Sequence, residues 1–388
     1  MLHPSRIEIS RGALRRNFRF LKTQVGAQTR ISSVIKGNAY GHGIGIFVPL
    51  AEECGIRHFS VFSADEALRT HQSRRAESDI AIMGYIADEA IEWAISEGIE
   101  FYVFDLGRLE AAGRVAARVG QPARIHLALE TGMNRTGFDE PELERAVEYI
   151  QAHPDAFTIE GLCTHFAGAE SVANHVRVRA QFDRYNAMHA WLDAQGIRAR
   201  YRHVACSAAA LTYPDTLLDM VRLGIAQYGL WPSAETRMRH FQRNSGNSEH
   251  RFVDPLSRVM RWSSRIMSIK RVKPGDFVGY GTSYLVTRNQ CLAAVPVGYY
   301  HGFPRSLSNL GHVLVNGRRA PVVGVVNMSA IMVDITDCAD VQRGDEVVII
   351  GRQKRGVITV SSFGDLTRNV NYEVLTRVPA EIPRCVVD

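Results

Sequence analysis

The chain has 388 residues, of which 46% are apolar and 22% charged, a composition typical of globular proteins that excludes a disordered or fibrous chain. The formal net charge of +6 comes from scattered basic residues without a nucleic-acid-binding motif. It therefore favours a solvated surface over a nucleic-acid site and suits a small anionic ligand. The length allows two domains, or one large barrel with an appendage.

The cysteines and the terminal segment indicate the compartment. The six cysteines are far apart and form no Cys-x-x-Cys pair, which argues against a zinc site and a disulfide framework. Residues 1–10 contain no apolar run of signal-peptide length, and no run approaches the roughly 20 residues of a membrane span. We therefore expect a cytoplasmic protein with reduced thiols, no metal site and no membrane segment.

Residues 12–230 alternate between helix-like and strand-like segments. Within 13–25, Leu14, Phe18, Leu21 and Val25 share one helical face, and Gly26 can end that helix. Eight short apolar runs follow, most of them separated by helix-length stretches: "ISSVI", "HFSVFSA", "IAIMGYI", "EFYVFD", "RIHLAL", "TIEGLCTHF", "RHVACSA" and "MVRLGIAQYGL". Such alternation predicts a (β/α)8 barrel rather than a doubly wound sheet. No G-x-G-x-x-G motif follows the first strand, which argues against a dinucleotide site.

A polar, turn-rich segment over residues 233–255 predicts a linker, and beyond it strands predominate. Asn316-Gly317, between valine-rich runs, is typical of a hairpin turn. We predict an α/β protein with a TIM-like (β/α)8 barrel over residues 11–240 and a mostly β domain over 241–388. The strand within residues 1–10 is expected to join the β domain.

Four reactive side chains lie where predicted barrel strands end: Lys36, His165, Ser207 and Arg222. Each alone has a structural interpretation, such as a solvated lysine or a salt-bridged arginine, but barrel active sites lie at this face. A strand-end lysine beside a Gly/Ser phosphate cradle suggests an imine-forming amine, whose pKa is lowered by burial and nearby cations. Pyridoxal phosphate fits both features.

Several motifs resemble the alanine racemase family, whose members are fold-type III pyridoxal-phosphate enzymes. The segment "VIKGNAYGHG" is similar to the family's cofactor-lysine signature. Further family-like motifs follow in family order through nearly the whole chain: "ETGMNRTGF", "THFAGAE", "VRLGIAQYGLWP", "VGYGTSY", "PVGYYHGF", "GRRAPVVGVVNM" and "NVNYEV". The series as a whole carries the resemblance, since any one motif is less specific.

The resemblance implies a two-base reaction at sites that two subunits share. Lys36 would carry the cofactor covalently and act as one base, and Tyr280 of a second subunit would be the base on the opposite face. Racemisation removes a proton from one face of Cα and delivers one to the other, which requires two acid/base groups. The implied assembly is a head-to-tail homodimer.

The resemblance also implies which residues bind the cofactor and the substrate. The cofactor phosphate would be held by Tyr40, Ser207, Gly224, Ile225 and Tyr372. His165 would support the ring, and Arg222 would contact the pyridine nitrogen. The carboxylate of a small amino-acid substrate would be held by Arg135 and the backbone at Met328, with Tyr299 lining the entrance.

The sequence departs from the family pattern around the substrate pocket. Ala128 stands where many members carry a lysine that becomes carbamylated and braces the substrate-binding arginine. The other departures are Asn327 and Ser329 in "VNMSA", His301, Cys206 and Leu223. None of them removes a proposed base.

The main hypothesis is an alanine racemase that supplies D-alanine for cell-wall precursors. A serine racemase or one of broader amino-acid range is the nearest alternative. A fold-type III amino-acid decarboxylase is more distant, because its glycine-rich phosphate loop and cysteine-bearing C-terminal motif are missing. A non-catalytic pyridoxal-phosphate-binding protein is the third alternative.

Overall fold

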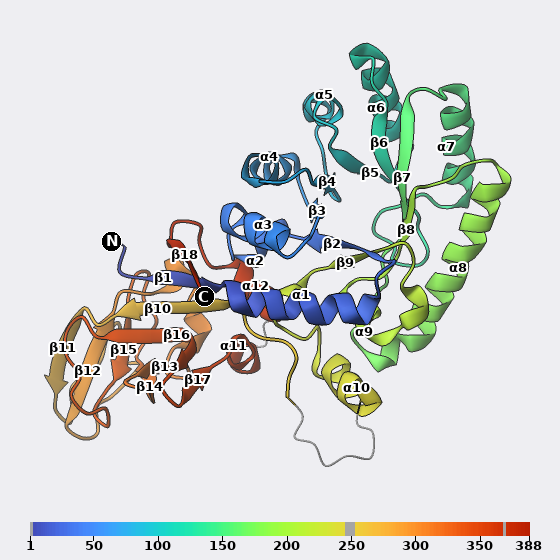
Figure 1. Ribbon diagram of the computed structural model, residues 1–388. Helices are drawn as coiled ribbons and strands as arrows, with labels where there is room; N and C mark the ends of the chain where they lie inside the picture. Colours follow the sequence, from blue (N-terminus) through green and yellow to red (C-terminus); the bar gives the residue numbers. More distant parts are fainter. Residues whose placement is uncertain (1–2, 245–252, 368–369) are drawn as a thin grey trace. The chain divides into compact units, whose positions relative to one another are not determined.

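The structure is a computed structural model that describes residues 3–244, 253–367 and 370–388 (Figure 1). The chain divides into two compact units. The barrel unit comprises Ala13–Gly37 and Phe47–Ser257, and the β unit comprises Met1–Gly12, Asn38–Ile46 and Arg258–Asp388.

Eight parallel strands form the barrel, in the order β8-β7-β6-β5-β4-β3-β2-β9. Their bounds are β2 Arg30–Val34, β3 His58–Val61, β4 Asp79–Ile82, β5 Glu100–Val103, β6 Ala123–Ala128, β7 Phe157–Cys163, β8 Tyr201–His203 and β9 Met220–Leu223. A parallel bridge between Cys206, three residues after β8, and Arg222 of β9 links the two ends of this order. All eight predicted strands are present, and the predicted barrel is confirmed.

Helices follow the strands along the chain (Figure 1). They are α1 Arg11–Val25, α2 Lys36–Tyr40, α3 Ile44–Glu53, α4 Ala64–Ser73, α5 Asp88–Ser96, α6 Leu106–Val119, α7 Glu140–Ala152, α8 His175–Ala194, α9 Ser207–Thr212 and α10 Ala234–Asn244. As predicted, Leu14, Phe18, Leu21 and Val25 are buried along one face of α1. Gly26 follows that helix with φ of 82°.

Polar side chains occupy part of the barrel interior. Glu100 on β5, His126 on β6 and His203 on β8 are each at most 1% exposed and belong to one hydrogen-bonded network. Side chains alternate between the two faces of a strand, so the buried Phe101 and Leu127 lie on the opposite face, toward the helices. Barrel interiors are usually filled with branched apolar residues, which makes this network a departure that needs an explanation.

The β unit contains a ten-stranded sheet in the order β11-β12-β15-β14-β13-β16-β10-β1-β18, with β17 paired to β16. Its first strand, β1 (Arg6–Ser10), pairs with β10 and β18. The other elements are β10 Met260–Arg265, β11 Ser268–Val272, β12 Gln290–Val295, β13 His312–Val315, β14 Arg318–Val323, β15 Ile331–Asp334, β16 Glu346–Gln353, β17 Gly356–Ile358, β18 Arg384–Val387, α11 Val360–Thr367 and α12 Asn371–Thr376.

The polar segment predicted as a linker is partly helical. Helix α10 occupies Ala234–Asn244, and Ser233 Oγ accepts the N–H of Thr236 at 3.0 Å at its start. Alanine, glutamate, arginine and methionine favour a helix despite the polarity of the segment. Within the rest of the predicted linker, residues 245–252 lie outside the described part of the chain. Within that part, no helix has both the length and the apolar character needed to cross a bilayer.

The turn between β13 and β14 tests the predicted hairpin. Asn316 and Gly317 have φ of 51° and 81°, as in a type I′ turn. An added Cβ at Gly317 would lie 2.9 Å from Lys354 Cβ. We expect Gly317→Ala to lower the free energy of unfolding by ~1–2 kcal/mol, measured by urea denaturation. Asn316→Gly, which keeps the positive φ and loses only the exposed hydrogen bond from Asn316 Nδ2 to the Ala339 carbonyl at 3.0 Å, is the control and should lower it by less than Gly317→Ala does. Identical midpoints for wild type and Gly317→Ala would contradict this turn geometry.

Candidate active site

The predicted strand-end residues of the barrel unit come together at one end of the barrel. Lys36 lies two residues beyond β2, and His165 lies two residues beyond β7. Arg222 lies within β9, and Ser207 begins α9 after β8. Carboxyl ends of parallel barrel strands meet at one face. Arg135 and Arg222 affect the ionisation of both Lys36 and His165, which places these four charged or titratable groups in one neighbourhood.

The environment of Lys36 favours its neutral amine. Lys36 has an exposed surface, although protein surrounds much of its ammonium group. Burial lowers the pKa of Lys36, the positive charges of Arg135 and Arg222 lower it further, and Glu66 acts in the opposite direction. A larger fraction of this amine is therefore nucleophilic near neutral pH than for a solvated lysine.

The end of β2 is fixed by residues that the sequence interpretation missed. Ser33 Oγ donates to Gln227 Oε1 at 2.7 Å, and Gln227 Nε2 donates to the carbonyl of Val34 at 2.8 Å. The hydroxyl of Tyr228 donates to the same carbonyl at 3.0 Å. These contacts hold the backbone two residues before Lys36. In the sequence, Gln227 is only a polar residue within the mostly apolar segment "GIAQYG". Its role becomes clear only from its hydrogen bonds to Ser33 and Val34.

The chain after Lys36 forms a left-handed turn. From Gly37 to Gly41 the five φ angles are 63°, 53°, 54°, 50° and 76°, so most of α2 is wound left-handed. L-residues pay roughly 1–2 kcal/mol each for this conformation. Asn38 compensates in part, because its Oδ1 accepts the N–H of Ile44 at 3.1 Å.

Arg222 is fixed through almost all of its hydrogen-bond donors. Nη1 donates to His203 Nδ1 and to the His203 carbonyl, both at 2.6 Å. Nη2 donates to the carbonyls of Thr164 at 2.7 Å and Val204 at 3.1 Å. A guanidinium has five N–H groups, so Nε–H remains, and among the described residues it has no hydrogen-bond partner. One donor of a permanent cation is thus left for a ligand.

His165 is neutral in this surrounding. Burial lowers the pKa of His165 to about 3, and the charges of Arg222, Arg135 and Lys36 contribute in the same direction. Its carbonyl accepts a hydrogen bond from Gln181 Nε2 at 3.0 Å. A neutral imidazole can support an aromatic ring without adding another positive charge to the site.

Ser207 and Gly224 are joined by a hydrogen bond. The Gly224 N–H donates to Ser207 Oγ at 2.9 Å, and both residues are buried. Ile225 begins the short helix η3 (Ile225–Tyr228), where the first N–H groups lack partners within the helix. The Ser207 hydroxyl hydrogen and the N–H of Ile225 are donors suited to a phosphate.

The other predicted site residues belong to the β unit. Tyr40 is 6% exposed and its ring centroid lies 5.8 Å from that of Tyr372. Tyr280 is 73% exposed, between two glycines with positive φ, in a loop whose flanks are bridged between Phe277 and Leu285. Tyr280 therefore lies at an exposed loop tip.

Two backbone loops carry Tyr299 and Met328. The N–H of Tyr299 donates to the Asn327 carbonyl, and the N–H of Tyr300 donates to the Met328 carbonyl, each at 3.0 Å. Tyr299 and Met328 are both exposed. Among the departures, His301 supports this region, because its Nδ1 accepts the N–H of Gly298 at 3.2 Å.

At Ala128 the barrel is apolar. Ala128 is 8% exposed and packs in a cluster with Ala81, Tyr102 and Cys163. The loop that carries Arg135 is held from another position, since the Glu130 carboxylate accepts the backbone N–H groups of Gly132 and Arg135. Glu130 therefore orders the backbone of the segment that carries Arg135.

Comparisons with known proteins cover both units. Residues 9–232 match the family model "Alanine racemase, N-terminal domain", and residues 259–386 match "Alanine racemase, C-terminal domain". The chain is 35% identical to "Alanine racemase" of Symbiobacterium thermophilum over 383 residues, which cover 99% of this chain and 97% of that protein. It is 33% identical to "Alanine racemase" of Leptospira interrogans over 386 residues, covering 100% and 96%.

Solved structures give the same result. An alanine racemase of Clostridium difficile superposes with a TM-score of 0.89 at 31% identity, covering 100% of this chain and 96% of that one. An alanine racemase of Bartonella henselae, described with covalently bound pyridoxal phosphate, has a TM-score of 0.83 at 26% identity and covers 99% and 100%.

The influence of Arg135 on Lys36 can be measured without any cofactor. Removing a neighbouring positive charge favours the ammonium form, so we expect Arg135→Gln to raise the pKa of Lys36. The pH dependence of trinitrobenzenesulfonate labelling, mapped to Lys36 by mass spectrometry, should shift to higher pH. Arg118→Gln removes an arginine that pairs with Glu92 on the exposed surface and is the control. An unshifted profile for Arg135→Gln would place Arg135 outside the site.

Proposed function

Because the chain belongs to the alanine racemase family, we propose that it is a pyridoxal-phosphate-dependent isomerase that interconverts L- and D-alanine. The observation that supports this most directly is that Lys36 and Arg222 lie in one neighbourhood, where the charge of Arg222 lowers the pKa of Lys36. An amine with a lowered pKa faces the same site as a guanidinium whose single remaining donor is Nε–H.

The donors of this chain fit pyridoxal phosphate. Lys36 supplies the amine for covalent attachment, and Ser207 with the N–H of Ile225 suits the phosphate. Tyr40 and Tyr372, whose rings are in contact, are proposed to complete the phosphate site, with Gly224 ordering Ser207. When bound, the cofactor delocalises the electron pair left on Cα and so makes the Cα proton acidic.

The remaining residues act on the pyridine ring, the substrate and the proton. Arginine stays protonated at any physiological pH, so Arg222 Nε–H would donate to the pyridine nitrogen and keep that nitrogen an unprotonated acceptor. Arg135 and the backbone at Met328 are proposed to bind the substrate carboxylate, and Tyr299 to line the entrance. Lys36 removes or returns the Cα proton on one face of the substrate.

Tyr280 is proposed to serve the opposite face in a second copy of the chain. Its exposed position at a loop tip leaves it available to a partner in a head-to-tail homodimer. A phenol has an unperturbed pKa near 10 and needs a nearby cation to act as a base, and Arg135 of the partner's barrel would supply one. The proposed place of action is the cytoplasm, where D-alanine would feed cell-wall precursors.

Proton exchange in heavy water tests the reaction. The holoenzyme is incubated in D2O with a panel of L-amino acids, and products are resolved by chiral chromatography and mass spectrometry. We expect deuterium at Cα and D-alanine as the fastest product, whereas Lys36→Ala should lose at least about 10³-fold in exchange. Faster turnover of serine would reassign the substrate, release of CO2 would indicate a decarboxylase, and cofactor binding without exchange would indicate a binding protein.

Mixing two inactive variants tests the shared site. We expect Tyr280→Phe to slow proton exchange from L-alanine more than from D-alanine, because each base serves one face. When equal amounts of Lys36→Ala and Tyr280→Phe chains exchange at random, about half of the dimers are mixed. One of the two sites in each mixed dimer regains both bases, so about a quarter of all sites should recover. Failure to recover activity in verified mixed dimers would contradict the composite site.

A further inference from the structure

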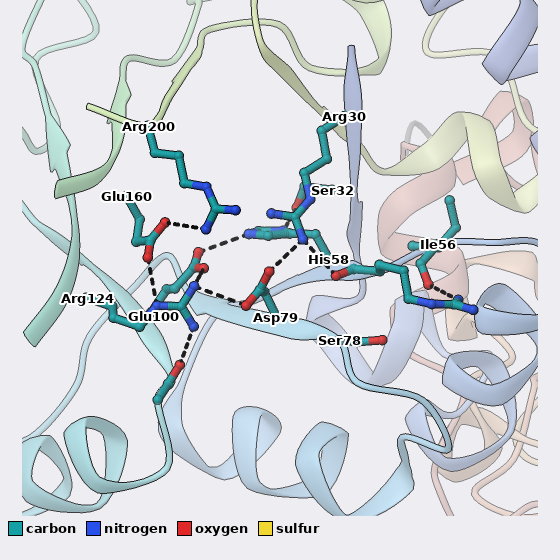
Figure 2. Close-up of polar contacts among 12 residues, drawn as sticks. Arg30, Ser32, Ile56, His58, Ser78, Asp79, Glu100, Arg124, Glu160 and Arg200 are labelled. Atoms are coloured by element: carbon teal, nitrogen blue, oxygen red, sulfur yellow. Dashed lines mark hydrogen bonds and ion pairs between the residues drawn. The ribbon is translucent and has the colours of Figure 1, made fainter. Parts of the chain in front are cut away.

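A buried carboxylate lies at the start of strand β5. Glu100 is 1% exposed, and its Oε2 accepts hydrogen bonds from His126 Nε2 at 2.7 Å and His58 Nε2 at 3.0 Å. Its other oxygen accepts from Arg124 Nη2 at 2.7 Å. Figure 2 shows Arg124 reaching Asp79, Glu100 and Glu160 together, so this arginine is itself fixed by three carboxylates.

The protonation of this cluster follows from its contacts. Burial alone would raise the pKa of Glu100, but His58 and His126 hold it well below its usual range. Burial lowers the pKa of both His126 and His203, so these rings are neutral. A neutral imidazole has one N–H donor and one acceptor nitrogen.

The acceptor-only carboxylate then sets the direction of the bonds that follow. His126 must carry its proton on Nε2, which leaves Nδ1 to accept from His203 Nε2, 2.9 Å away. His203 therefore presents the lone pair of Nδ1 to Arg222 Nη1 at 2.6 Å. Every hydrogen bond between Arg222 and Glu100 points toward the carboxylate.

We propose that Glu100, acting through His126 and His203, is the positioning residue that holds Arg222 with its Nε–H toward the pyridine nitrogen. This rests on the proposed function, which places the cofactor at Arg222. With the chain reversed, His203 Nδ1–H and Arg222 Nη1–H would be two donors 2.6 Å apart. The guanidinium could not keep its place, because arginine has no acceptor.

The two histidines that donate to Glu100 differ in the partner of their other ring nitrogen, Nδ1. His58 Nδ1 contacts Ser32 Oγ at 2.8 Å, which contacts Ser60 Oγ at 2.6 Å. Hydroxyls both donate and accept, so this branch can reverse its direction without losing a bond. Only the branch through His126 ends in an obligatory donor. His58 is therefore a matched control on the same carboxylate oxygen.

Gly161 makes the His126–His203 contact possible. A Cβ at this position would lie 1.9 Å from His126 Nδ1 and 2.6 Å from His203 Nε2. Gly161→Ala therefore interrupts the chain at its middle bond without changing any polar group.

A metal ion is the competing occupant of this cluster. The ligand atoms of His58, Glu100 and His126 lie within 4.8 Å of one another. A metal needs unprotonated nitrogens, which would reverse the bonds toward Arg222. Arg124 also occupies the second oxygen of Glu100. The contacts therefore favour the hydrogen-bonded chain.

The decisive measurement compares pyridoxal phosphate with its deaza analogue, in which C–H replaces the pyridine nitrogen. In the wild type, we expect pyridoxal phosphate to bind about tenfold or more tightly than the analogue, because a hydrogen bond to a charged donor is lost. In Glu100→Gln this preference should fall toward one. In this variant the amide oxygen stays on Arg124, because arginine can only donate hydrogen bonds. The NH2 group of the amide then donates to the histidines, which reverses the direction of the hydrogen bonds toward Arg222. Gly161→Ala should also lose the preference, and His58→Gln should keep it.

Each outcome separates the hypotheses. A purely structural role of Glu100 would weaken both ligands equally and would overturn the proposal, as would an unchanged preference in Glu100→Gln. A wild type without any preference would instead refute the proposed contact at Arg222. Independently of the variants, 15N spectra of histidine-labelled apoprotein should show His126 and His203 protonated on Nε2, and an Nδ1–H form of either ring, or a stoichiometric bound metal, would overturn the inference.

Discussion

The site depends on how one guanidinium is saturated with hydrogen bonds. The four Nη–H donors of Arg222 bond to His203, Thr164 and Val204, all at the ends of two neighbouring strands. A buried cation with unmet donors is costly, so these bonds fix both the position and the plane of the group. What remains for chemistry is one donor with a set direction. The low pKa of the neighbouring His165 and the lowered pKa of Lys36 follow in part from this same fixed charge.

Much of the architecture is predictable because it depends on local patterns. The eight apolar runs mark the eight barrel strands, and the Asn316-Gly317 pair marks a hairpin turn through its backbone preference. Lys36, His165, Ser207 and Arg222 could be found from their positions at strand ends. Their proposed roles, like the domain limits, remain predictions.

The barrel interior was not predictable for a physical reason. Glu100 and His126 stand singly within apolar runs, and His203 stands beside Arg202 at the start of one. A polar residue in such a place has many ordinary explanations. Their meaning comes from mutual contacts between residues 26 to 77 positions apart, which no local pattern encodes. The polar helix α10 was missed for the opposite reason, since its polarity concealed good helix-forming residues.

The left-handed turn after Lys36 has a stereochemical consequence. A right-handed preference is a property of L-residues, and the fully buried Ala39, with φ of 54°, holds a backbone shape that its mirror image adopts without penalty. A synthetic protein with D-alanine at position 39 would therefore lack the backbone strain that L-alanine has at this φ. The backbone that presents the proposed attachment lysine is thus better suited to D-alanine, the proposed product, than to the alanine that it contains.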